Sequence, residues 1–390
     1  MPPSIRPRKS VALLIETSNA YARGLLEGIV SYVRRHEPWS LYVPEIRRGE
    51  VPAEFAGRWR GDGIIARIEN VETAKAVRRA KLPTVDVSSG RHLPDVPWVE
   101  TDDAAIARVA LEHLAERGFR HFAYCGDPRF AWSRWREEHF TAGVAALGAK
   151  CSVWNAPRER ADGAAGPREQ RKLAEWVKSL PKPVGILACY DIQAQRLLDA
   201  CRDAEVAVPE EAAVLGVDDD RLLCDLCSPP LSSVVPSTLR TGYAAAETLD
   251  KLMRGETVSA AGQLIPPLGV AVRQSTDILA IDDPDIAAAV RFIREHACDG
   301  IQVGDVLRRV PLSRRVLESR FQKLIGRTPH DEILRIKIER VKRLLQETDL
   351  TLEAIADRCG FRHVEYLSVA FKRATGLPPS RFRRNETSGR

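Results

Sequence analysis

The sequence predicts a two-lobed α/β body followed by an all-α domain that carries two helix-turn-helix motifs. Up to about residue 275, short apolar runs alternate with segments of helical periodicity. Beyond residue 285 the periodic segments are all helical. The first pattern is typical of parallel sheets with crossover helices, and its length suits two lobes better than one. The change of period therefore predicts a domain boundary between the two parts.

The elements of the α/β part follow from short apolar runs and from helical spacing between them. The expected strands are residues 11–15, 63–66, 83–87, 121–124, 184–188 and 213–217. The expected helices include residues 21–35, 104–117, 171–179 and 192–204. We place the α/β domain at 1–275, a linker at 276–285 and the helical domain at 286–390. Asp283 suits the N-cap position of the helix that follows, and Pro284 suits its first position.

Length and composition agree with this division. A chain of 390 residues is too long for one hydrophobic core, and its 44% hydrophobic and 29% charged residues are typical of globular proteins. No apolar run approaches the eighteen or so residues of a membrane span. The apolar run behind the basic N-terminus is too short for a secretion signal. We therefore expect a cytoplasmic protein with no membrane partner.

The helical domain repeats one pattern, at about 303–325 and again at about 352–375. Each copy has a short helix, a turn and a longer helix, and the longer helix ends at Gly326 or Gly376. A continuous helix, residues 329–346, joins the two copies. One helix-turn-helix is a weak signal because helix pairs are common, whereas a tandem pair on a rigid connector is much rarer. We therefore interpret the domain as a tandem reader of the DNA major groove.

Charge is unevenly spread along the chain. Residues 286–390 contain 22 Lys and Arg against 13 Asp and Glu, a net charge of +9, whereas the rest of the chain carries a net charge of −3. A basic module on a slightly acidic body favours a polyanionic partner for that module alone.

The helical domain resembles the DNA-binding domains of the arabinose-regulator family. The resemblance covers residues 285–384 and is carried by LEAIADRCGFRHVEYLSVAFKRATGLPPSRFR and, in the first copy, by SRRVLESRFQKLIGRTP. The alternative is a helical oligomerisation module. The resemblance implies double-stranded operator DNA as partner, with the N-terminal side chains of both recognition helices in the major groove.

The candidate DNA-binding residues divide between base edges and phosphates. Arg315 suits a guanine edge and Glu318 a cytosine amino group, whereas Val364 and Val369 stand where the family often has polar side chains. The base-reading candidates are Ser313, Arg314, Arg315, Glu318 and Ser319, then His363, Val364, Glu365, Tyr366 and Val369. The phosphate candidates are Arg327, Arg335, Lys337 and Arg381, for each of which a solvated charged face is the alternative.

The α/β part resembles the lac-repressor and periplasmic sugar-binding family. The resemblance rests on LLIETSNAYARGLLEGI, TDDAAIARVALEHLAERGFRHFAYCG, ILACYDIQAQRLLDACRDAEVAVPEEAAVLGVDDD and PPLSSVVPSTLRTGYAAAETL, in that order. It implies two Rossmann-like lobes that close on a sugar at the carboxyl ends of their strands. Unlike lac repressor, this chain has no N-terminal DNA-binding headpiece. The fusion of such a body with an arabinose-type reader resembles the family of bacterial xylose-operon activators.

A sugar site needs planar hydrogen-bonding groups for hydroxyls and an aromatic face for the C–H side of the ring. Asp191 and Asp218 follow strands, and Arg136 offers a planar donor fork. The full set of candidates is Thr17, Ser18, Asn19, Tyr21, Asp86, Trp135, Arg136, Asp191 and Asp218. Strand-end carboxylates also cap helices, and aromatic residues also fill cores, so these structural roles are the alternatives.

Other chemistries find little support. The eight cysteines are scattered, and the pair Cys224 and Cys227 has no second pair at zinc-ligand spacing, so we expect no metal. Motifs for dinucleotide, phosphate-loop or zinc-protease chemistry are absent from the sequence, and the run Asp218–Asp220 cannot point three carboxylates at one ion. We expect no cofactor and no enzyme activity.

The combined expectation is a homodimeric activator of a sugar-catabolism operon. A monosaccharide, xylose or a related sugar, would bind the α/β domain, and the dimer would act on RNA polymerase while bound to DNA in the nucleoid. The alternatives are a repressor that sugar releases from DNA, a cytoplasmic sugar-binding protein with a helical dimerisation tail, and a sugar-modifying enzyme.

Overall fold

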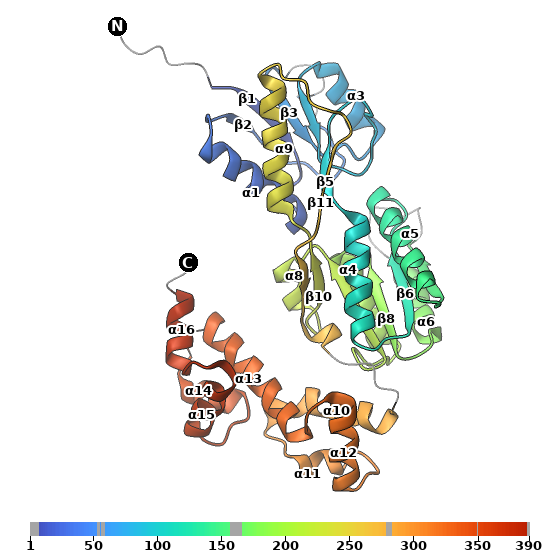
Figure 1. Ribbon diagram of the computed structural model, residues 1–390, viewed down its shortest axis with the longest axis vertical. Helices are drawn as coiled ribbons and strands as arrows, with labels where there is room; N and C mark the ends of the chain where they lie inside the picture. Colours follow the sequence, from blue (N-terminus) through green and yellow to red (C-terminus); the bar gives the residue numbers. More distant parts are fainter. Residues whose placement is uncertain are drawn as a thin grey trace. The chain divides into compact units, whose positions relative to one another are not determined.

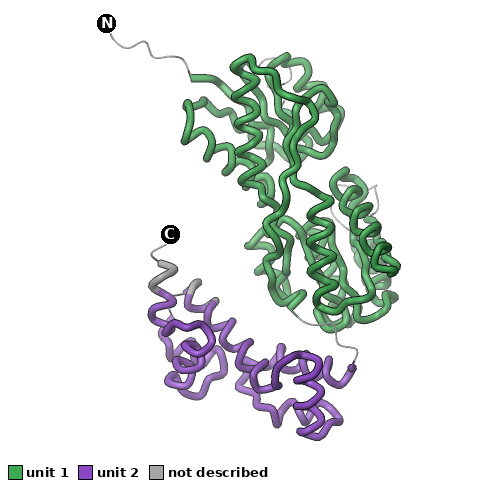
Figure 2. Tube along the Cα trace, viewed as in Figure 1, with its two compact units in different colours: residues 1–277 green, residues 278–390 purple. Residues whose placement is uncertain are grey.

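The structure is a computed structural model that describes residues 8–52, 55, 59–156, 166–277, 283–348 and 350–387. It divides into two compact units, Met1–Asp277 and Ile278–Arg390 (Figure 2). Within the predicted linker, residues 278–282 lie outside the described residues. Across the residues described, no helix is both long and apolar enough to cross a membrane.

The first lobe of unit 1 is built on a four-stranded parallel sheet in the order β2-β1-β3-β4. Its strands are β1 (Ser10–Leu14), β2 (Ser40–Tyr42), β3 (Gly63–Ala66) and β4 (Thr84–Asp86). Its helices are α1 (Ala20–Arg35), α3 (Val71–Ala80) and α9 (Thr238–Met253). One apolar cluster joins β1, α1 and α9, so a helix from late in the chain completes the core of this lobe.

The second lobe carries a six-stranded sheet in the order β12-β10-β9-β8-β6-β7, in which only β12 runs antiparallel. Its strands are β6 (His121–Gly126), β7 (Cys151–Asn155), β8 (Val184–Ala188), β9 (Ala212–Val217), β10 (Ser232–Val235) and β12 (Gly269–Ala271). Its helices are α4 (Asp103–Glu116), α5 (Ala131–Ala146), α6 (Pro167–Ser179), α7 (Asp191–Asp203) and α8 (Arg221–Leu226). The central strands are buried on both faces, as a sheet covered by helices on both sides requires.

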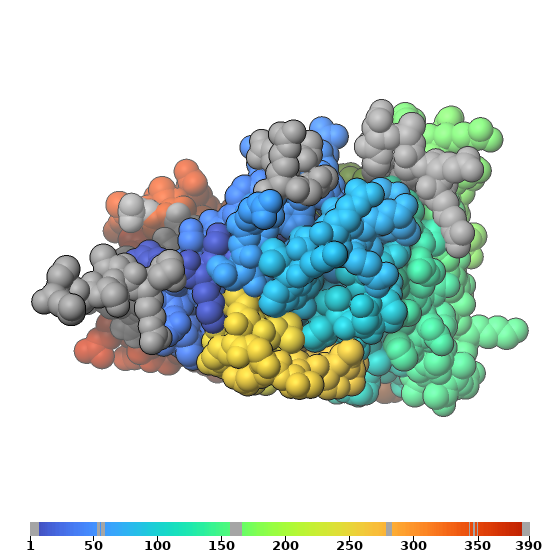
Figure 3. All heavy atoms as spheres, turned by 90° about the horizontal axis from the view of Figure 1, so that it is seen from above, coloured from blue at the N-terminus to red at the C-terminus, as the bar shows by residue number. Residues whose placement is uncertain are grey.

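The chain passes between the lobes three times. A parallel pair, β5 (Val99–Thr101) and β11 (Gln263–Ile265), forms two of these passages and lies between the two larger sheets in Figure 1. The space-filling view shows the yellow α9–β11 segment directly against blue and cyan atoms of the first lobe (Figure 3). The third passage runs from β10 into α9. After β11 the chain returns to β12 and ends unit 1 in a short 3-10 turn, Gln274–Thr276.

The predicted fold class is confirmed for this unit. The six predicted strands coincide with β1, β3, β4, β6, β8 and β9, and the four predicted helices with α1, α4, α6 and α7. The strands that were not predicted are β2, β7, β10 and β12 of the two larger sheets and the crossover strands β5 and β11. These are short or only half-buried, so they lack a long apolar run.

Unit 2 is all helical in its described residues and contains the two predicted helix-turn-helix motifs. Its helices are α10 (Pro284–His296), α11 (Val303–Leu307), α12 (Arg314–Ile325), α13 (Pro329–Glu347), α14 (Leu352–Arg358), α15 (Val364–Thr375) and α16 (Pro379–Thr387), with a 3-10 turn at Ala297–Asp299. The first motif is α11–α12, the second is α14–α15, and α13 connects them (Figure 1).

The ends of these helices show why the sequence folds this way. Asp283 accepts from the backbone N–H groups of Asp285 and Ile286, as an N-cap residue does. Ser313 is the N-cap residue of α12 by backbone position, although its side chain makes no capping hydrogen bond. Gly326 and Gly376 end α12 and α15 with positive φ, which glycine adopts without strain.

Candidate functional site

A cavity between the two lobes of unit 1 lies at the carboxyl ends of β3 and β9, beside the crossover strand β5. Its empty space is about 290 Å³, open solvent included, and it is lined by Tyr21, Arg48, Arg67, Glu100, Thr101, Trp132, Arg136 and Asp218. Carboxyl ends of parallel strands are where α/β folds place ligands. Charged and aromatic side chains from both lobes therefore converge on one small volume.

The two arginines of the first lobe that line this cleft are paired with carboxylates. Arg67 is buried and forms ion pairs with Glu16 and with Glu69. Arg48 places Nε 3.4 Å from Glu16 Oε1 and 3.2 Å from Glu69 Oε2. The positive charges are thus offset before any ligand binds, which favours a ligand without net charge.

In the second lobe, Arg136 is likewise paired with a carboxylate. Its Nε donates to Asp103 Oδ1 at 2.6 Å and its Nη1 donates to the carbonyl of Cys189 at 2.6 Å. These bonds hold the buried guanidinium against Trp132, whose ring centroid lies 4.8 Å from Arg136 Cζ. No described residue accepts from Nη2, so this donor is available to a ligand.

Two further donors of the lining lack acceptors. Arg67 Nε and Trp132 Nε1 are buried, and no described residue accepts a hydrogen bond from either. A buried N–H without an acceptor costs about 1–3 kcal/mol, so native structures rarely leave one without a reason. The rings of Tyr21 and Trp132 add apolar faces. The lining therefore offers donors, two carboxyl groups and aromatic rings, which is the combination that a polyhydroxylated ring needs.

Asp218 stands on a constrained loop after β9. Its φ is 113° and that of Asp219 is 49°, conformations that residues with side chains rarely adopt. The backbone N–H of Asp218 donates to Val234 O at 3.1 Å, and that of Asp219 donates to Ser233 Oγ at 3.0 Å. Burial raises the pKa of Asp218 to about 6, although Arg136, Arg48 and Arg67 act in the opposite direction.

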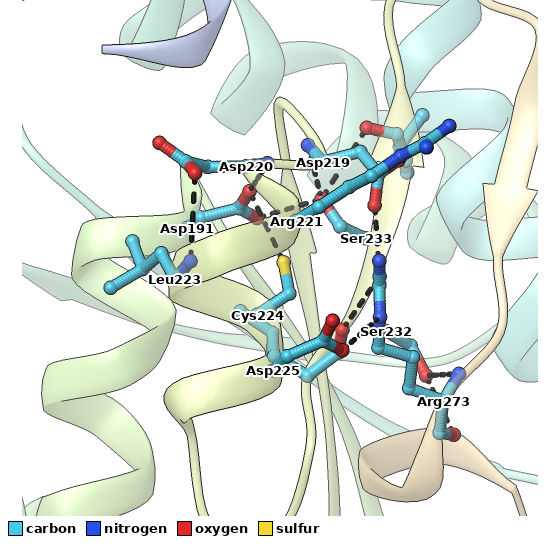
Figure 4. Close-up of polar contacts among 12 residues, drawn as sticks. Asp191, Asp219, Asp220, Arg221, Leu223, Cys224, Asp225, Ser232, Ser233 and Arg273 are labelled. Carbon is cyan, nitrogen blue, oxygen red and sulfur yellow. Dashed lines mark hydrogen bonds and ion pairs between the residues drawn. The ribbon is translucent and has the colours of Figure 1, made fainter. Parts of the chain in front are cut away.

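Asp191 holds this loop in place through the hydrogen bonds that it accepts (Figure 4). It accepts from Ser233 Oγ at 2.7 Å, from the backbone N–H of Asp220 at 2.8 Å and from Cys224 Sγ at 3.5 Å. A Cβ on Gly216 would lie 2.2 Å from Asp191 Oδ1, so this packing requires glycine in β9. Burial and the nearby Asp218 raise the pKa of Asp191 well above its usual range.

Arg273 fixes the loop from the other side. Its Nη1 donates to Asp219 Oδ1 at 2.8 Å and to Leu231 O at 3.1 Å, and its Nε donates to Asp225 Oδ1 at 3.2 Å (Figure 4). Arg273 directly precedes the 3-10 turn with which unit 1 ends. The Asp218 loop and the exit of the chain from unit 1 are thus linked by one side chain.

Three of the sugar candidates, Tyr21, Arg136 and Asp218, are among the residues that line the cleft. Asn19 accepts from Ala22 N as the N-cap of α1, and Thr17 and Ser18 precede it; none of the three is among the lining residues. Asp191 also lies outside the lining; it accepts hydrogen bonds from the backbone of Asp220 and from Ser233 and does not cap a helix, which was the alternative stated for it.

The remaining two sugar candidates are also outside the lining. Asp86 is buried and accepts from Ile68 N, Ser88 N and Ser88 Oγ, and burial raises its pKa to about 7. Trp135 is half-buried, and its ring lies 5.5 Å from Arg91 Cζ.

The sequence analysis missed five lining residues: Arg48, Arg67, Glu100, Thr101 and Trp132. Arg67 could have been found, because it follows a buried strand just as Asp218 does. Trp132 was also within reach, since it lies one helical turn before Arg136 and therefore on the same face of α5. Arg48 and the pair in β5 carry no comparable signal, because their position depends on how the lobes pack.

The raised pKa of Asp218 has a consequence for stability. A folded-state pKa above the usual value means that the folded protein binds the proton more tightly, so stability falls as pH rises from about 4 through about 6. Asp218→Asn should therefore raise the free energy of unfolding of the sugar-free protein by about 1–3 kcal/mol at about pH 7.5, and by less at about pH 5. Urea denaturation at both pH values measures this. A difference in stability between the variant and the native protein that is the same at both pH values would contradict the raised pKa of Asp218.

The DNA-reading candidates of the first motif lie on α12. Arg314 donates from Nε to Glu318 Oε1 at 2.9 Å, so two of them form an exposed ion pair with each other. Ser313, Arg315 and Ser319 are exposed. For Arg315 the described residues provide no ion-pair partner.

The second motif presents a different surface on α15. His363 is the N-cap residue, Glu365 is exposed, and Tyr366 and Val369 are 49% and 67% exposed. Val364 is half-buried and packs on the core of this motif. An exposed apolar pair on a reading helix suits thymine methyl groups.

The phosphate candidates differ in what they contact. Arg327 and Arg335 both donate to the buried Glu332, the first at 3.0 Å and the second at 2.9 Å. Lys337 is only 8% exposed and donates from Nζ to Gly360 O at 2.7 Å. Because the structure gives this amine an internal partner, we leave Lys337 out of the phosphate contacts proposed below. Arg381 is exposed on α16.

A groove lies between the two motifs and reaches both reading helices; its empty space is about 1130 Å³, open solvent included. Arg314 of α12 and His363 and Tyr366 of α15 line it together with Lys337 of α13, and no acidic side chain is among its lining residues. The N-terminal ends of both reading helices therefore border one basic depression. In the part of the chain that the structure describes, no three His, Cys, Asp or Glu side chains are grouped to hold a metal.

Three family models match the chain. A periplasmic binding protein-like domain matches residues 111–276, a XylR N-terminal domain matches residues 10–104, and a helix-turn-helix domain matches residues 306–385.

The chain is similar over its length to the xylose operon regulatory proteins of Haemophilus influenzae and Escherichia coli K12. The identities are 34% over 383 residues and 33% over 384 residues; each alignment covers 96% of this chain, with 98% and 97% of the relatives.

Solved structures agree with these matches. The structure described as the xylose-binding transcription activator XylR has a TM-score of 0.82 at 32% identity and covers 97% of this chain and 98% of its own. A LacI transcriptional regulator from a Rhodococcus species has a TM-score of 0.58 at 20% identity and covers 70% of this chain and 100% of its own, which shows the fold of unit 1 alone.

Proposed function

Because the chain belongs to the family of xylose operon regulatory proteins, we propose that it is an activator of a sugar-catabolism operon that responds to xylose or a closely related monosaccharide. It is a transcription regulator and not an enzyme. The sugar would bind the cleft of unit 1, and the tandem helix-turn-helix domain would bind a double-stranded operator.

The observation that carries the sugar assignment is the composition of the cleft. Its arginines already face carboxylates, so the site does not call for an anion such as a sugar phosphate. Three donors, Arg67 Nε, Trp132 Nε1 and Arg136 Nη2, have no acceptor among the described residues. Hydroxyl oxygens of a neutral sugar would supply those acceptors, and its hydroxyl protons would donate to Asp218.

A thermal-shift screen against pentoses and hexoses tests this proposal. A ligand present at a hundred times its Kd adds about 2.7 kcal/mol to the stability of the state that binds it. We expect D-xylose, or an epimer of it, to raise the unfolding temperature of the full chain by several degrees, and the corresponding sugar acid to have no effect. A screen in which only anionic sugars stabilise the protein would contradict the neutral-ligand assignment.

The proposed base contacts are exposed side chains of the two reading helices, α12 and α15, and of their N-caps. Arg315 and Ser319 in the first helix and His363, Tyr366 and Val369 in the second would face base edges. Arg381 would contact phosphate.

Arg315→Ala should weaken binding to the native operator by about 1–3 kcal/mol and relax the preference at one or two base pairs. Arg381→Ala should instead weaken binding to all sequences about equally. Anisotropy titrations against the operator and single-base variants distinguish the two effects. A uniform loss in both variants would show that Arg315 does not read a base.

The switch would work through two states of a homodimer in the cytoplasm. A ligand shifts such an equilibrium only by its different affinity for the two states. Closure of the lobes on sugar would change the Asp218 loop, and Arg273 would pass that change to the exit of unit 1. Contact with RNA polymerase would follow from operator position. A repressor released by sugar is the second candidate, and mapping the operator relative to the promoter separates the two.

A further inference from the structure

Two cysteines of unit 2 lie close together although 61 positions separate them in the sequence. Cys298 lies in the 3-10 turn after α10, and Cys359 is the C-cap residue of α14. The backbone carbonyl of Cys298 lies against Gly360, the residue that follows Cys359, and the side chain of Cys359 acts on the pKa of the Cys298 thiol. Cys298 is half-buried and Cys359 is fully buried, so Cys298 is the more accessible of the two residues.

The backbone around this pair is tightly packed. A Cβ on Gly360 would lie 2.5 Å from the carbonyl oxygen of Cys298 and 2.6 Å from the nitrogen of Gly300. Gly360 has a φ of 67° and accepts a hydrogen bond from Lys337 Nζ at 2.7 Å. The residues that follow α10 therefore lie directly against the turn of the second helix-turn-helix motif.

The charge around the two sulfurs favours a thiolate. The side chain of Cys359, together with the positive charges of Arg340 and Lys337, lowers the pKa of Cys298 below its usual value. The side chain of Cys298 and burial raise the pKa of Cys359. A reactive thiolate with a protonated neighbour in reach is the arrangement of an attacking and a resolving cysteine.

The other cysteines for which a shift is resolved lie in the opposite environment. Burial raises the pKa of Cys224 and of Cys227, the pair that the sequence pattern singles out, and Cys224 donates to Asp191. Burial also raises the pKa of Cys151 to about 12, although this side chain is half-buried like Cys298. Exposure alone therefore does not explain why the pKa of Cys298 is lowered and that of Cys151 is raised. The difference comes from the groups that surround each thiol.

We propose that Cys298 and Cys359 form an oxidisable dithiol that closes to a disulfide across the two halves of the DNA-binding domain. The oxidant is a small hydroperoxide such as hydrogen peroxide. The Cys298 thiolate attacks one peroxide oxygen, the O–O bond breaks, and Cys298 becomes a sulfenic acid as hydroxide leaves. The Cys359 sulfur then attacks the Cys298 sulfur, the S–O bond breaks, and the hydroxyl leaves as water with the Cys359 proton. The two sulfurs lose two electrons in total, which the peroxide gains.

The disulfide would form close to the second reading helix. Cys359 directly precedes the turn that leads to the reading helix α15, and the groove lined by Gly300, Lys337 and Gly360 also contacts Arg314, His363 and Tyr366. Oxidation would thus place a covalent link beside the surface proposed to read DNA.

Peptide mapping of the full chain tests the proposal. The reduced protein is treated with limiting hydrogen peroxide, the remaining thiols are alkylated, and a non-reducing digest is examined by mass spectrometry. We expect the Cys298 peptide joined to the Cys359 peptide as the first product, two hydrogens lighter than the sum and restored by a dithiol reductant. We also expect Cys298 to react several-fold faster than Cys151, because more of it is thiolate at neutral pH.

Three variants make the result decisive. Cys359→Ala should stop the reaction at a sulfenic acid on Cys298, and Cys298→Ser should abolish the linked peptide. Cys151→Ser is the matched control and should leave the product unchanged. A first product that joins any other cysteines, or oxidation of Cys298 to sulfinic acid in the native protein with Cys359 still alkylated, would overturn the proposal.

Discussion

Replacing Arg136 with methionine is expected to lower the affinity for the sugar about tenfold to a hundredfold. Hydrogen bonds from a charged group contribute about 1.5–3 kcal/mol, and each 1.4 kcal/mol is a factor of ten in affinity. Methionine keeps the length of the side chain and its packing beside Trp132, but it has no donor for a hydroxyl oxygen. Calorimetric titration of the full chain with the sugar found in the thermal-shift screen measures the loss.

A second variant is needed, because Arg136 also stabilises the fold through its ion pair with Asp103. Removing it leaves Asp103 buried without its cation, and breaking a buried pair in this way costs about 3–5 kcal/mol. The double variant Arg136→Met with Asp103→Asn removes both charges and should be more stable than the single variant, with the same loss of sugar affinity. Arg134→Met, an exposed change on the same helix, is the matched control. Full sugar affinity in the double variant would place the sugar elsewhere.

The DNA-binding domain alone, residues 278–390, should bind operator DNA with a steep dependence on salt. It is a compact unit of its own, and α13, α14 and α15 share an apolar core, so we expect the fragment to fold. If it contacts about six phosphates, its affinity should fall by roughly a thousandfold between about 50 mM and about 200 mM monovalent salt. Anisotropy titrations at four or five salt concentrations give the slope.

Residues 1–277 serve as the control for this measurement, because they form the other compact unit. They should show no operator binding at any of these salt concentrations. A salt-independent interaction of the helical fragment, or equal binding by the two fragments, would contradict the assignment of DNA binding to the tandem motifs.

The fold was largely predictable because its signals are local. Buried strands such as β8 and β9 are continuous apolar runs, and the helix ends at Gly326 and Gly376 need the backbone freedom of glycine. The edge strand β2 and the crossover strand β5 are three residues each, too short for a pattern. Their existence depends on partners far away in the sequence.

The cleft was only partly predictable, because a lining side chain depends on long-range packing. Asp218 and Arg136 could be placed since one follows a strand and the other lies on a helix that starts beside the cleft. Trp135 and Trp132 are three positions apart on one helix. The spacing of Trp132 from Arg136 favours the second, and the structure shows that Trp132 lines the cavity. Asp191 has the same local context as Asp218, yet it binds the loop instead of lining the cavity.

The helical domain shows the same limit for charged residues. Lys337 and Arg381 look alike in sequence, but the first donates to Gly360 inside the domain and the second is exposed on α16. Net charge does not show which lysines and arginines bind groups inside the domain and which are exposed.

The proposal that sugar binding in one unit controls DNA binding by the other is tested most directly by a paired titration. Full-length protein is titrated with labelled promoter DNA at fixed salt, without sugar and with sugar at about a hundred times its Kd. We expect the sugar to change promoter affinity about fivefold or more, the usual range of coupling between two sites. In the Arg136→Met, Asp103→Asn variant, the same change should need about tenfold to a hundredfold more sugar. Equal promoter affinity with and without a sugar that the native protein demonstrably binds would contradict it.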